Sequence, residues 1–365
     1  MSVVGCRFEG VTIAVEAPDD DDLAWLAAFL DCGFERAAPG GATRHVAYVT
    51  DAHAYDRLRE RARPGGLPLV TAFADETGPM PLERWSGPDP GDLFHDPTRP
   101  VFYHVSPDGA RVRLVAREPT RKTRNALMRV VRELAMGPVV ATGGVLVHAA
   151  AVATDGGVVV VSGPKRAGKT TLLLALLEGG GTRFVAADRC VLRRGGDGVS
   201  VRGLPTLVSI RTDAFGRSSR LGERLARIRP DRAGAAARER PRVSLTPPEF
   251  CELMACGTSP GGPLAALVFP VIDEPVGGPP LRRLDAAGAR ARFHAGLFRA
   301  RADRVLGDVF VGGLGAAAAR SPADLAAPLA PWIAQTVPCF EYRLPRGAPP
   351  GPEDGRALLA RCAAP

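Results

Sequence analysis

The stretch of sequence that decides the fold is VVVVSGPKRAGKTTLLLALL, residues 158–177. Its valines predict a buried strand, because β-branched residues favour strands, and its leucines predict a helix. Between the two lies a glycine-rich turn, residues 163–170, that matches the pattern GxxxxGK[ST]. A P-loop, which binds nucleotide phosphates, needs such a turn between a strand and a helix. The sequence therefore predicts an α/β fold with a nucleotide-binding core.

The residues of this turn suit phosphate binding. Gly163 and Gly168 let the backbone curl so that N–H groups point at phosphate oxygens, and the following helix adds its positive end. Lys169 places a compact ammonium on the β- and γ-phosphates, and Thr170 offers a hydroxyl to Mg²⁺. Lys165 has two interpretations, a solvated loop residue or a contact to phosphate or acceptor. We therefore expect ATP and Mg²⁺, with the nucleotide bound by Gly163, Pro164, Lys165, Arg166, Ala167, Gly168, Lys169, Thr170 and Thr171.

Composition restricts the class of protein. The 365 residues are enough for two domains, and the apolar content of 45% is enough for buried cores. No run of about 18 apolar residues predicts a membrane span, and the N-terminus lacks the pattern of a signal peptide. We therefore expect a cytoplasmic protein without a membrane partner. Seven cysteines without a CxxC pair predict reduced thiols and no structural zinc.

The positive charge comes almost entirely from arginine. The chain has a net charge of +8 and 47 basic residues, of which only Lys122, Lys165 and Lys169 are lysines. Abundant alanine, glycine, arginine and proline indicate a GC-rich coding bias. We therefore do not count the charge as evidence for a polyanion, and nucleic acid is not the expected partner.

The pattern of apolar residues divides the chain into three stretches. Residues 1–135 predict an α+β N-terminal domain, residues 136–345 the core, and residues 346–365 a C-terminal tail. The segments predicted within them are strands at 7–16, 44–50, 110–118 and 339–344, helices at 22–30, 121–137, 285–298 and 321–336, and a loop at 86–100.

A histidine is predicted to lie at the mouth of the phosphate loop. In GVLVHAAAVATDGGVVVVSG, residues 144–163, Asp155 and Gly156 suit a type I′ hairpin turn. The register then sets Thr154 opposite Gly157 and His148 opposite Gly163. The other interpretation of His148 is a core residue that only packs.

Two carboxylate sites are candidates for binding metal or taking a proton. Asp188 follows a predicted strand at 184–187, and carboxylates at strand ends reach the ligand crevice in open α/β sheets. It is the leading Mg²⁺ ligand or base, and the alternative is a surface hairpin aspartate beside Arg189. The run LAALVFPVIDE, residues 264–274, ends in Asp273 and Glu274, as the metal-binding strand of many P-loop ATPases does. Its Pro270 predicts an edge or bent strand instead.

A basic stretch and a cysteine pair also stand out. Residues 211–242 carry many arginines among turn residues and predict a solvated basic loop, a lid over the phosphates or an acceptor-docking surface. Arg211 is the member to test first. Cys251 and Cys256 are expected to be buried thiols.

Residues 145–192, VLVHAAAVATDGGVVVVSGPKRAGKTTLLLALLEGGGTRFVAADRCVL, resemble the catalytic core of the HPr kinase/phosphorylase family and its related kinases. The likeness extends more loosely to about residue 345, including VPCFEYRLP, and the N-terminal domain shows no clear match. The resemblance implies that residues 163–170 bind ATP and Mg²⁺, that His148 lies at the phosphate site, and that Asp188 is the first aspartate of an acidic pair. Arg189 stands where the family has the second aspartate, which activates the acceptor hydroxyl.

Three functions therefore remain open. The favoured one is a kinase, with Asp188, His148 and Lys169 as catalytic residues, that phosphorylates a hydroxyl of a peptide, a small protein or a small metabolite. In this hypothesis the N-terminal domain recognises the substrate, and the family resemblance leaves open a homo-oligomer. The second function is a catalytically inactive nucleotide-binding module, suggested by Arg189. The third is a P-loop ATPase that uses Asp273 and Glu274.

Overall fold

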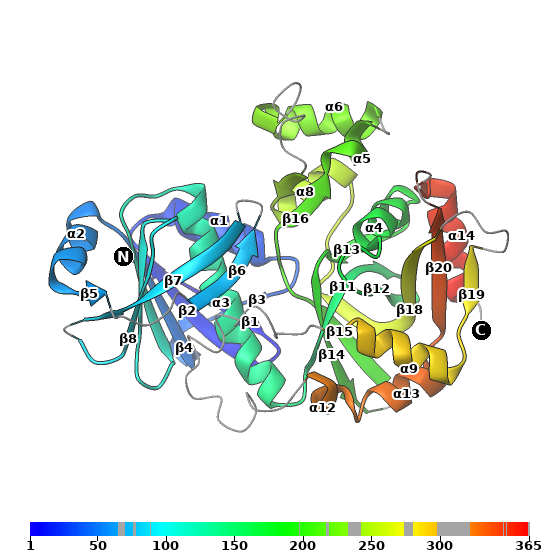
Figure 1. Ribbon diagram of the computed structural model, residues 1–365, viewed down its shortest axis with the longest axis horizontal. Coiled ribbons are helices and arrows are strands. Elements are labelled where there is room, and N and C mark those ends of the chain that lie inside the picture. The colour runs from blue at the N-terminus through cyan, green and yellow to red at the C-terminus, as the bar shows by residue number, and fades with distance from the viewer. Residues whose placement is uncertain are drawn as a thin grey trace. The chain divides into compact units, whose positions relative to one another are not determined.

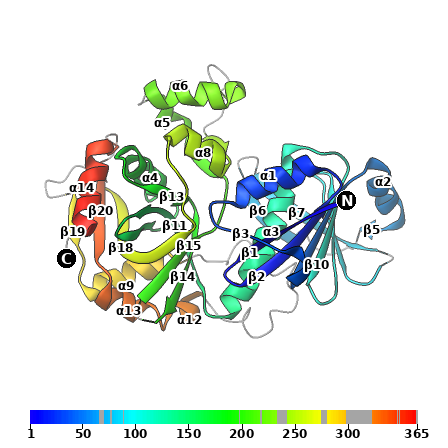
Figure 2. The same ribbon diagram turned by 180° about the vertical axis from the view of Figure 1, so that it is seen from behind.

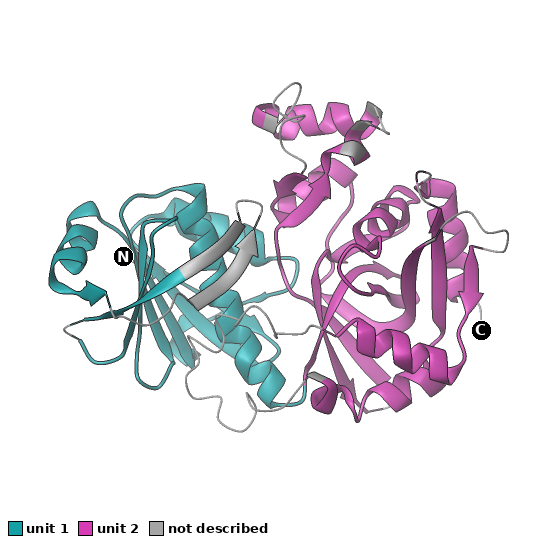
Figure 3. Cartoon of the chain, viewed as in Figure 1, with its two compact units in different colours: residues 1–143, 299–321 teal, residues 144–298, 322–365 magenta. Residues whose placement is uncertain are grey.

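The chain forms two compact units. The computed structural model describes residues 1–64, 70–75, 78–87, 89–196, 198–216, 219–232, 242–273, 280–297, 322–345, 347 and 349–363. Unit 1 comprises Met1–Gly143 and Arg299–Ser321, and unit 2 comprises Gly144–Phe298 and Pro322–Pro365 (Figure 3). The boundary predicted near residue 135 falls inside helix α3 (Arg121–Ala141) of unit 1.

Unit 1 is a mixed sheet with helices on both faces (Figure 1). The Tyr48 hydroxyl bonds to Thr123 of α3 on one face, whereas Tyr55 of α2 packs with Phe102 on the other. The strands, in sheet order, are β3 (Glu35–Ala37), β1 (Ser2–Phe8), β2 (Val11–Ala17), β4 (Arg44–Thr50), β10 (Arg111–Ala116), β9 (Val101–Val105), β8 (Asp92–Asp96), β7 (Gly78–Ser86) and β5 (Arg63–Pro64), with β6 (Val70–Asp75) paired to β7.

The helices of unit 1 begin at side-chain caps. The predicted helix at 22–30 is confirmed as α1 (Asp20–Leu30), where the Asp19 carboxylate accepts the Asp21 N–H. Helix α2 (Ala52–Arg61) begins after Asp51 in the same way. The prediction that α3 ends at Gly137 is wrong, since Pro138 lies inside the helix and its carbonyl accepts the Thr142 N–H. Among the described residues, no helix has the length and apolar character required to cross a bilayer.

The prediction of a loop at residues 86–100 is wrong in part. The middle of this segment forms β8, which pairs with β7 and β9. Leu93 and Phe94 are buried there, so two apolar side chains and a ladder on each side outweigh the turn residues. The proline and glycine signals mark the turns that flank the strand.

Unit 2 contains an eight-stranded sheet that closes on itself. The order is β12, β11, β14, β15, β18, β20, β19, and β18 also pairs with β12, while β13 pairs with β11. The strands are β11 (Val145–Thr154), β12 (Gly157–Ser162), β13 (Arg183–Ala186), β14 (Arg189–Gly195), β15 (Gly198–Gly203), β18 (Gly261–Asp273), β19 (Leu281–Arg283) and β20 (Cys339–Pro345). The predicted hairpin is confirmed, with Thr154 opposite Gly157.

Of the predicted edge or bent strand at residues 264–274, the edge position is wrong for the described part of that run. Strand β18 lies between β12 and β20 and runs parallel to both. The Leu267 N–H donates to the Pro338 carbonyl, on the side of β20. Successive residues of a strand direct their backbone nitrogens to opposite sides, so the nitrogen of Pro270, three residues further on, points toward β12. Strand β12 has already ended there at Ser162, and a residue without an N–H leaves no ladder bond unmade.

Helices cover both faces of the unit 2 sheet (Figures 1 and 2). On one face, α4 (Lys169–Glu178) packs on β11 and β12 and is itself covered by α14 (Pro352–Ala363). The predicted C-terminal tail therefore contains a helix of this unit. On the other face, Phe293 of α9 (Ala286–Ala295) and Ile333 of α13 (Ala330–Thr336) join the main apolar core, and α12 (Pro322–Ala326) lies at its edge.

The basic stretch is largely helical where the structure describes it. It contains α5 (Thr212–Gly216) and α6 (Ser219–Ile228), whose Leu221 and Leu225 are buried. These helices accompany α8 (Pro247–Met254) and a two-stranded sheet of β16 (Val208–Arg211) and β17 (Arg242–Leu245). The prediction of a solvated loop is therefore wrong for α5 and α6, and residues 233–241 lie outside the described part.

The contact of α14 with α4 depends on one glycine. A Cβ at Gly355 would lie 2.1 Å from the Ala175 carbonyl oxygen. We expect Gly355→Ala to lower the free energy of unfolding by about 1–3 kcal/mol, because the two backbones must separate. The measurement is urea unfolding. The matched control is Gly222→Ala in α6, where the nearest atom would lie 3.5 Å away and the gain is up to about 1 kcal/mol. Equal effects of the two changes would contradict the packing argument.

Candidate functional site

The glycine loop, residues 163–168, joins β12 to α4 as the sequence predicts for these two elements. Pro164, Lys165 and Arg166 form its exposed tip, and Arg166 has a positive φ of 69°. Among the described residues, no hydrogen bond or ion pair holds the Lys165 side chain. The loop therefore presents its tip to solvent and its two ends to the sheet.

Gly168 is required by conformation and by space. It precedes α4 with φ 101°, which side chains of L-residues rarely permit. A Cβ there would lie 2.1 Å from Leu344 Cδ1 of β20 and 3.7 Å from Ile272 Cγ1 of β18. The C-terminal ends of two parallel strands thus support the last turn of the loop.

Lys169 is a buried cation at the start of α4. Its Nζ donates 2.9 Å hydrogen bonds to the carbonyl oxygens of Gly163 and Pro164, and the residue is 7% exposed. Burial lowers the pKa of Lys169 to about 8, although the negative charge of Asp188 acts in the opposite direction. Two neutral carbonyls leave the charge uncompensated, so an anion placed in the loop would stabilise it.

His148 and Asp188 come together where β11 changes its pairing partner. Residues 145–148 of β11 pair with β14, whereas residues 151–153 pair with β13. Asp188 lies in the bend between β13 and β14, and its carbonyl accepts the Ala149 N–H at 3.0 Å. Continuing the β11–β12 register places His148 level with Gly163, as the hairpin count predicts.

The side chains of His148 and Asp188 define the tautomer of the imidazole. His148 Nδ1 lies 3.0 Å from the Asp188 carbonyl oxygen and 3.1 Å from Asp188 Oδ1. Both are acceptors, so Nδ1 carries the hydrogen and the lone pair of a neutral ring is at Nε2. The second carboxylate oxygen, Oδ2, lies 3.4 Å from Arg189 Nε. Arg189 is thus an ion-pair partner of Asp188.

Gly296, after α9, is a site residue that sequence reasoning missed. Its carbonyl accepts the His148 N–H at 2.9 Å. A Cβ at Gly296 would lie 2.2 Å from Ser162 Oγ and 3.3 Å from the Gly163 nitrogen. The glycine after a predicted helix marks a C-cap, but no local signal shows that the cap packs against the start of the glycine loop.

The structure places the remaining predicted residues as follows. Thr170 and Thr171 lie half-buried in the first turn of α4. Asp273 ends β18, three residues beyond Pro270, which is level with Gly163, so its backbone lies about 10 Å further along the strand. Glu274 lies outside the described residues. Over the described ranges, no group of three or more His, Cys, Asp or Glu side chains is arranged to hold a metal ion.

Two arginines of the basic stretch have partners in neighbouring elements of unit 2. Arg229 pairs with Asp231 at 2.8 Å and with Glu249 at 3.6 Å, and Arg224 donates to the Leu253 carbonyl. Arg211 is the exposed last residue of β16. These bonds hold α6 to α8 and β17, which is a structural role.

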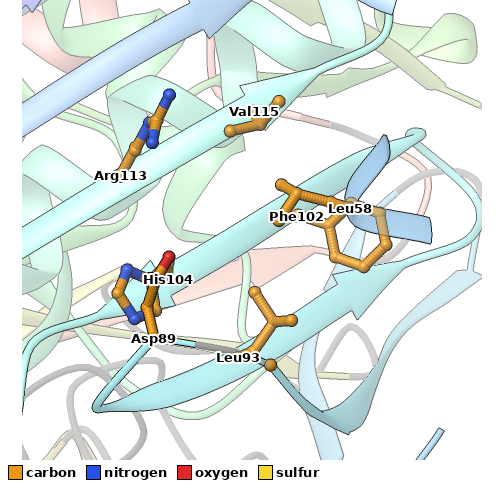
Figure 4. Close-up of a pocket in the computed structure, with 8 residues that line it drawn as sticks. Leu58, Asp89, Leu93, Phe102, His104, Arg113 and Val115 are labelled. Carbon is orange, nitrogen blue, oxygen red and sulfur yellow. The ribbon is translucent and has the colours of Figure 1, made fainter. Parts of the chain in front are cut away.

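A shallow pocket of about 350 Å³, counting space open to solvent, lies in unit 1 and not at the glycine loop (Figure 4). Its lining combines apolar side chains, among them Phe102 and Val115, with the polar side chains of Arg113, His104 and Asp89. His104 bonds to the Pro90 carbonyl. The pocket shares Leu93 and Phe102 with the apolar cluster beneath α2.

A substitution at Gly168 tests the geometry of the loop. We expect Gly168→Ala to lower the free energy of unfolding by about 1–3 kcal/mol, from the positive φ and the contact with Leu344. Leu344→Ala in the same chain removes the contact but not the strained φ. The double variant should therefore recover part of the loss relative to the sum of the two single changes, measured by urea unfolding. Strict additivity would contradict the contact.

Comparison with known proteins does not assign the chain to a family. No family model matches the chain, and no curated protein matches its sequence at a significant level.

Proposed function

We propose that unit 2 binds ATP with Mg²⁺ and transfers the γ-phosphate to a hydroxyl of a peptide, a small protein or a small metabolite. The observation that carries the proposal is a buried ammonium on a glycine loop, with a carboxylate–imidazole pair at the level where the loop begins. Phosphoryl transfer needs little covalent chemistry from a protein. It needs positioning, positive charge and a group that accepts the proton.

The glycine loop and Lys169 would bind the phosphates. The N–H groups at the start of α4 have no acceptor within the helix and carry its positive end, as phosphate oxygens require. The Lys169 amine would exchange the carbonyls of Gly163 and Pro164 for phosphate oxygens, which pair its charge. A buried cation held near its working position loses little freedom when an anion binds.

His148 would accept the proton of the acceptor hydroxyl. Its Nδ1–H is held by the carbonyl and the carboxylate of Asp188, so the ring is oriented and Nε2 keeps its lone pair. Asp188 is then a positioning residue for His148, whereas the sequence favoured Asp188 as the base and held His148 in reserve. Arg189 keeps the carboxylate paired on its other oxygen.

Thr170 and Asp188 are the residues that would hold Mg²⁺. The Asp188 side chain is 40% exposed, so a cation can reach its carboxylate from solvent. Mg²⁺ commonly keeps several waters and takes one or two protein ligands beside the phosphates, so a set of three protein ligands is not required. When bound, the ion neutralises charge on the phosphate oxygens.

Two other functions have specific observations behind them. Arg189 beside Asp188 fits a module that binds nucleotide without transferring phosphate. Strand β18, parallel to β12 and ending in Asp273, fits a P-loop ATPase. The kinase proposal is preferred because Asp188 and His148 lie at the start of the glycine loop, whereas the backbone of Asp273 lies further along its strand.

Labelled ATP provides the test of transfer. With γ-labelled ATP, Mg²⁺ and pooled acceptors, we expect wild type to label an acceptor and Lys169→Ala to lose both binding and transfer. His148→Gln should lower the transfer rate by about 10²–10⁴ fold and leave nucleotide affinity within a few fold, because general bases contribute about that much. Asp188→Asn should lower the transfer rate at least as much as His148→Gln, leave a measurable residual rate, and spare binding. Asp273→Asn is the matched control and should retain both.

Combining two substitutions tests whether the pair acts as a unit. If Asp188 works through His148, the double variant His148→Gln, Asp188→Asn should be no slower than the slower single variant. Independent roles would instead multiply the two losses. ATP bound by wild type without transfer or hydrolysis would establish the binding module, and hydrolysis lost only in Asp273→Asn would establish the ATPase.

Proton uptake tests the role of Lys169. In the ligand-free protein the pKa of Lys169 is lowered to about 8, and phosphate oxygens should raise it again. One unit above that pKa the free amine is mostly neutral and the bound amine is charged, so binding takes up a proton and affinity falls as pH rises. Calorimetry in buffers of different ionisation enthalpy measures the uptake. Lys169→Arg, which stays charged, should show none, and equal uptake in both proteins would refute the assignment.

A further inference from the structure

Helix α8 ends in a motif that brings two cysteines together. The Cys256 N–H donates to the Cys251 carbonyl at 3.0 Å, and the Ala255 N–H donates to the Glu252 carbonyl at 3.2 Å. Ala255 adopts a left-handed conformation with φ 51°. These features define a Schellman motif, in which the side chains of its first and last residues meet. In this chain those two residues are both cysteines.

The two thiols are in contact and differ in access. The Cys251 side chain hydrogen-bonds the Cys256 thiol, Cys251 is buried, and Cys256 is half-buried. The backbone bond between the residues holds their Cα atoms within the separation of about 4.4–6.8 Å that disulfides span. The pair therefore has an accessible thiol with a second thiol directly beneath it.

Cys256 also differs electrostatically from the other thiols. The hydrogen bond from Cys251 lowers the pKa of Cys256, against the effect of burial. Burial raises the pKa of the thiols of Cys6, Cys32, Cys190, Cys339 and Cys362. Since the thiolate is the nucleophile, Cys256 is the more reactive position.

We propose that Cys251 and Cys256 are an oxidation site, at which a peroxide converts the two thiols into an intrachain disulfide across the end of α8. This inference does not depend on nucleotide binding. The site has an accessible sulfur for the peroxide and a resolving sulfur in contact with it.

The reaction balances with peroxide as the oxidant. The Cys256 thiolate attacks one peroxide oxygen, the O–O bond breaks, and a sulfenic acid forms while the other oxygen leaves as an alcohol or water. The Cys251 thiolate then attacks the sulfenic sulfur, the S–S bond forms, and the sulfenic oxygen leaves as water with one proton. Two thiols and one peroxide thus give one disulfide, one water and the reduced peroxide.

The disulfide would cross-link α8 to a segment that pairs with β13. Phe184 N–H donates to the Gly257 carbonyl, and Phe184 accepts from the Ser259 N–H, both at 2.8 Å. The ring of Phe184 also packs against Phe250 of α8 at 5.0 Å between centroids. The cross-link therefore joins elements that are already in contact and needs little movement of the backbone.

Thiol mapping on the full chain tests the site. Reduced protein is treated with hydrogen peroxide while folded, then unfolded in urea with N-ethylmaleimide so that every remaining thiol is blocked, and digested with trypsin. Cleavage after Arg242 and Arg282 releases residues 243–282, whose only cysteines are Cys251 and Cys256. We expect this peptide to lose two hydrogens, to take no maleimide, and to take two after reduction with dithiothreitol. Cys362 is buried and distant from the pair in the sequence, so it is the internal control. It should take maleimide both with and without peroxide treatment.

Two variants and an unfolded control separate the steps. In Cys251→Ser, Cys256 should accumulate as a sulfenic acid that dimedone traps, and in Cys256→Ser, Cys251 should stay reduced. Urea-unfolded wild type should lose the preference for this pair over Cys362. The proposal is overturned if the folded wild-type peptide takes two maleimides after peroxide treatment, or if sulfenic acid persists at Cys256 while Cys251 is present.

Discussion

The site in unit 2 depends on one backbone hydrogen bond, from the Ala149 N–H to the Asp188 carbonyl. It lies where β11 exchanges β14 for β13 as its partner, and it holds the bend that carries Asp188 against the strand that carries His148. The same carbonyl also receives His148 Nδ1. Strand β11 is also the hairpin partner of β12, which leads into the glycine loop. The carboxylate, the imidazole and the glycine loop are therefore all positioned by β11.

Close backbone packing connects the glycine loop to distant parts of the chain. Gly168 leaves room for Leu344 and Ile272, and Gly296 leaves room for Ser162. A methyl group at Gly168 would overlap Leu344 Cδ1 and would touch Ile272 at ordinary contact distance, and a methyl group at Gly296 would overlap Ser162 Oγ. The loop is therefore positioned by β20, β18 and the end of α9, and not only by the strand and helix that it connects. Protein interiors resist such overlap because they are already packed at the density of organic crystals.

Electrostatics complements this packing. Lys169 is buried against carbonyl dipoles, which tolerate its charge but do not neutralise it, and its pKa falls accordingly. Asp188, by contrast, has a cationic neighbour in Arg189 and a donor in His148. A buried cation held by neutral carbonyls favours an anionic ligand, and the contacts of Asp188 with His148 preserve the orientation of the imidazole while that ligand is absent.

Local patterns in the sequence were enough to predict the hairpin of β11 and β12, the glycine loop, α4 and α1. Turn residues, β-branched runs and capping groups act within a few residues of one another, so no distant partner is needed. The placement of Gly163, Gly168 and Lys169 followed from the same local spacing. Strand β8 escaped prediction because its stability comes from neighbours on both sides, which outweigh flanking proline and glycine.

Only the tertiary structure decided the parts that depend on pairing between distant segments. It made β18 a central strand, since Pro270 faces the end of β12 where no ladder bond is required. It brought the His148 side chain to Asp188, and Gly296 to the start of the glycine loop. Sequence patterns report the conformational preference of each segment, whereas the choice of partner is set by the free energy of packing the segments together, which no single segment carries.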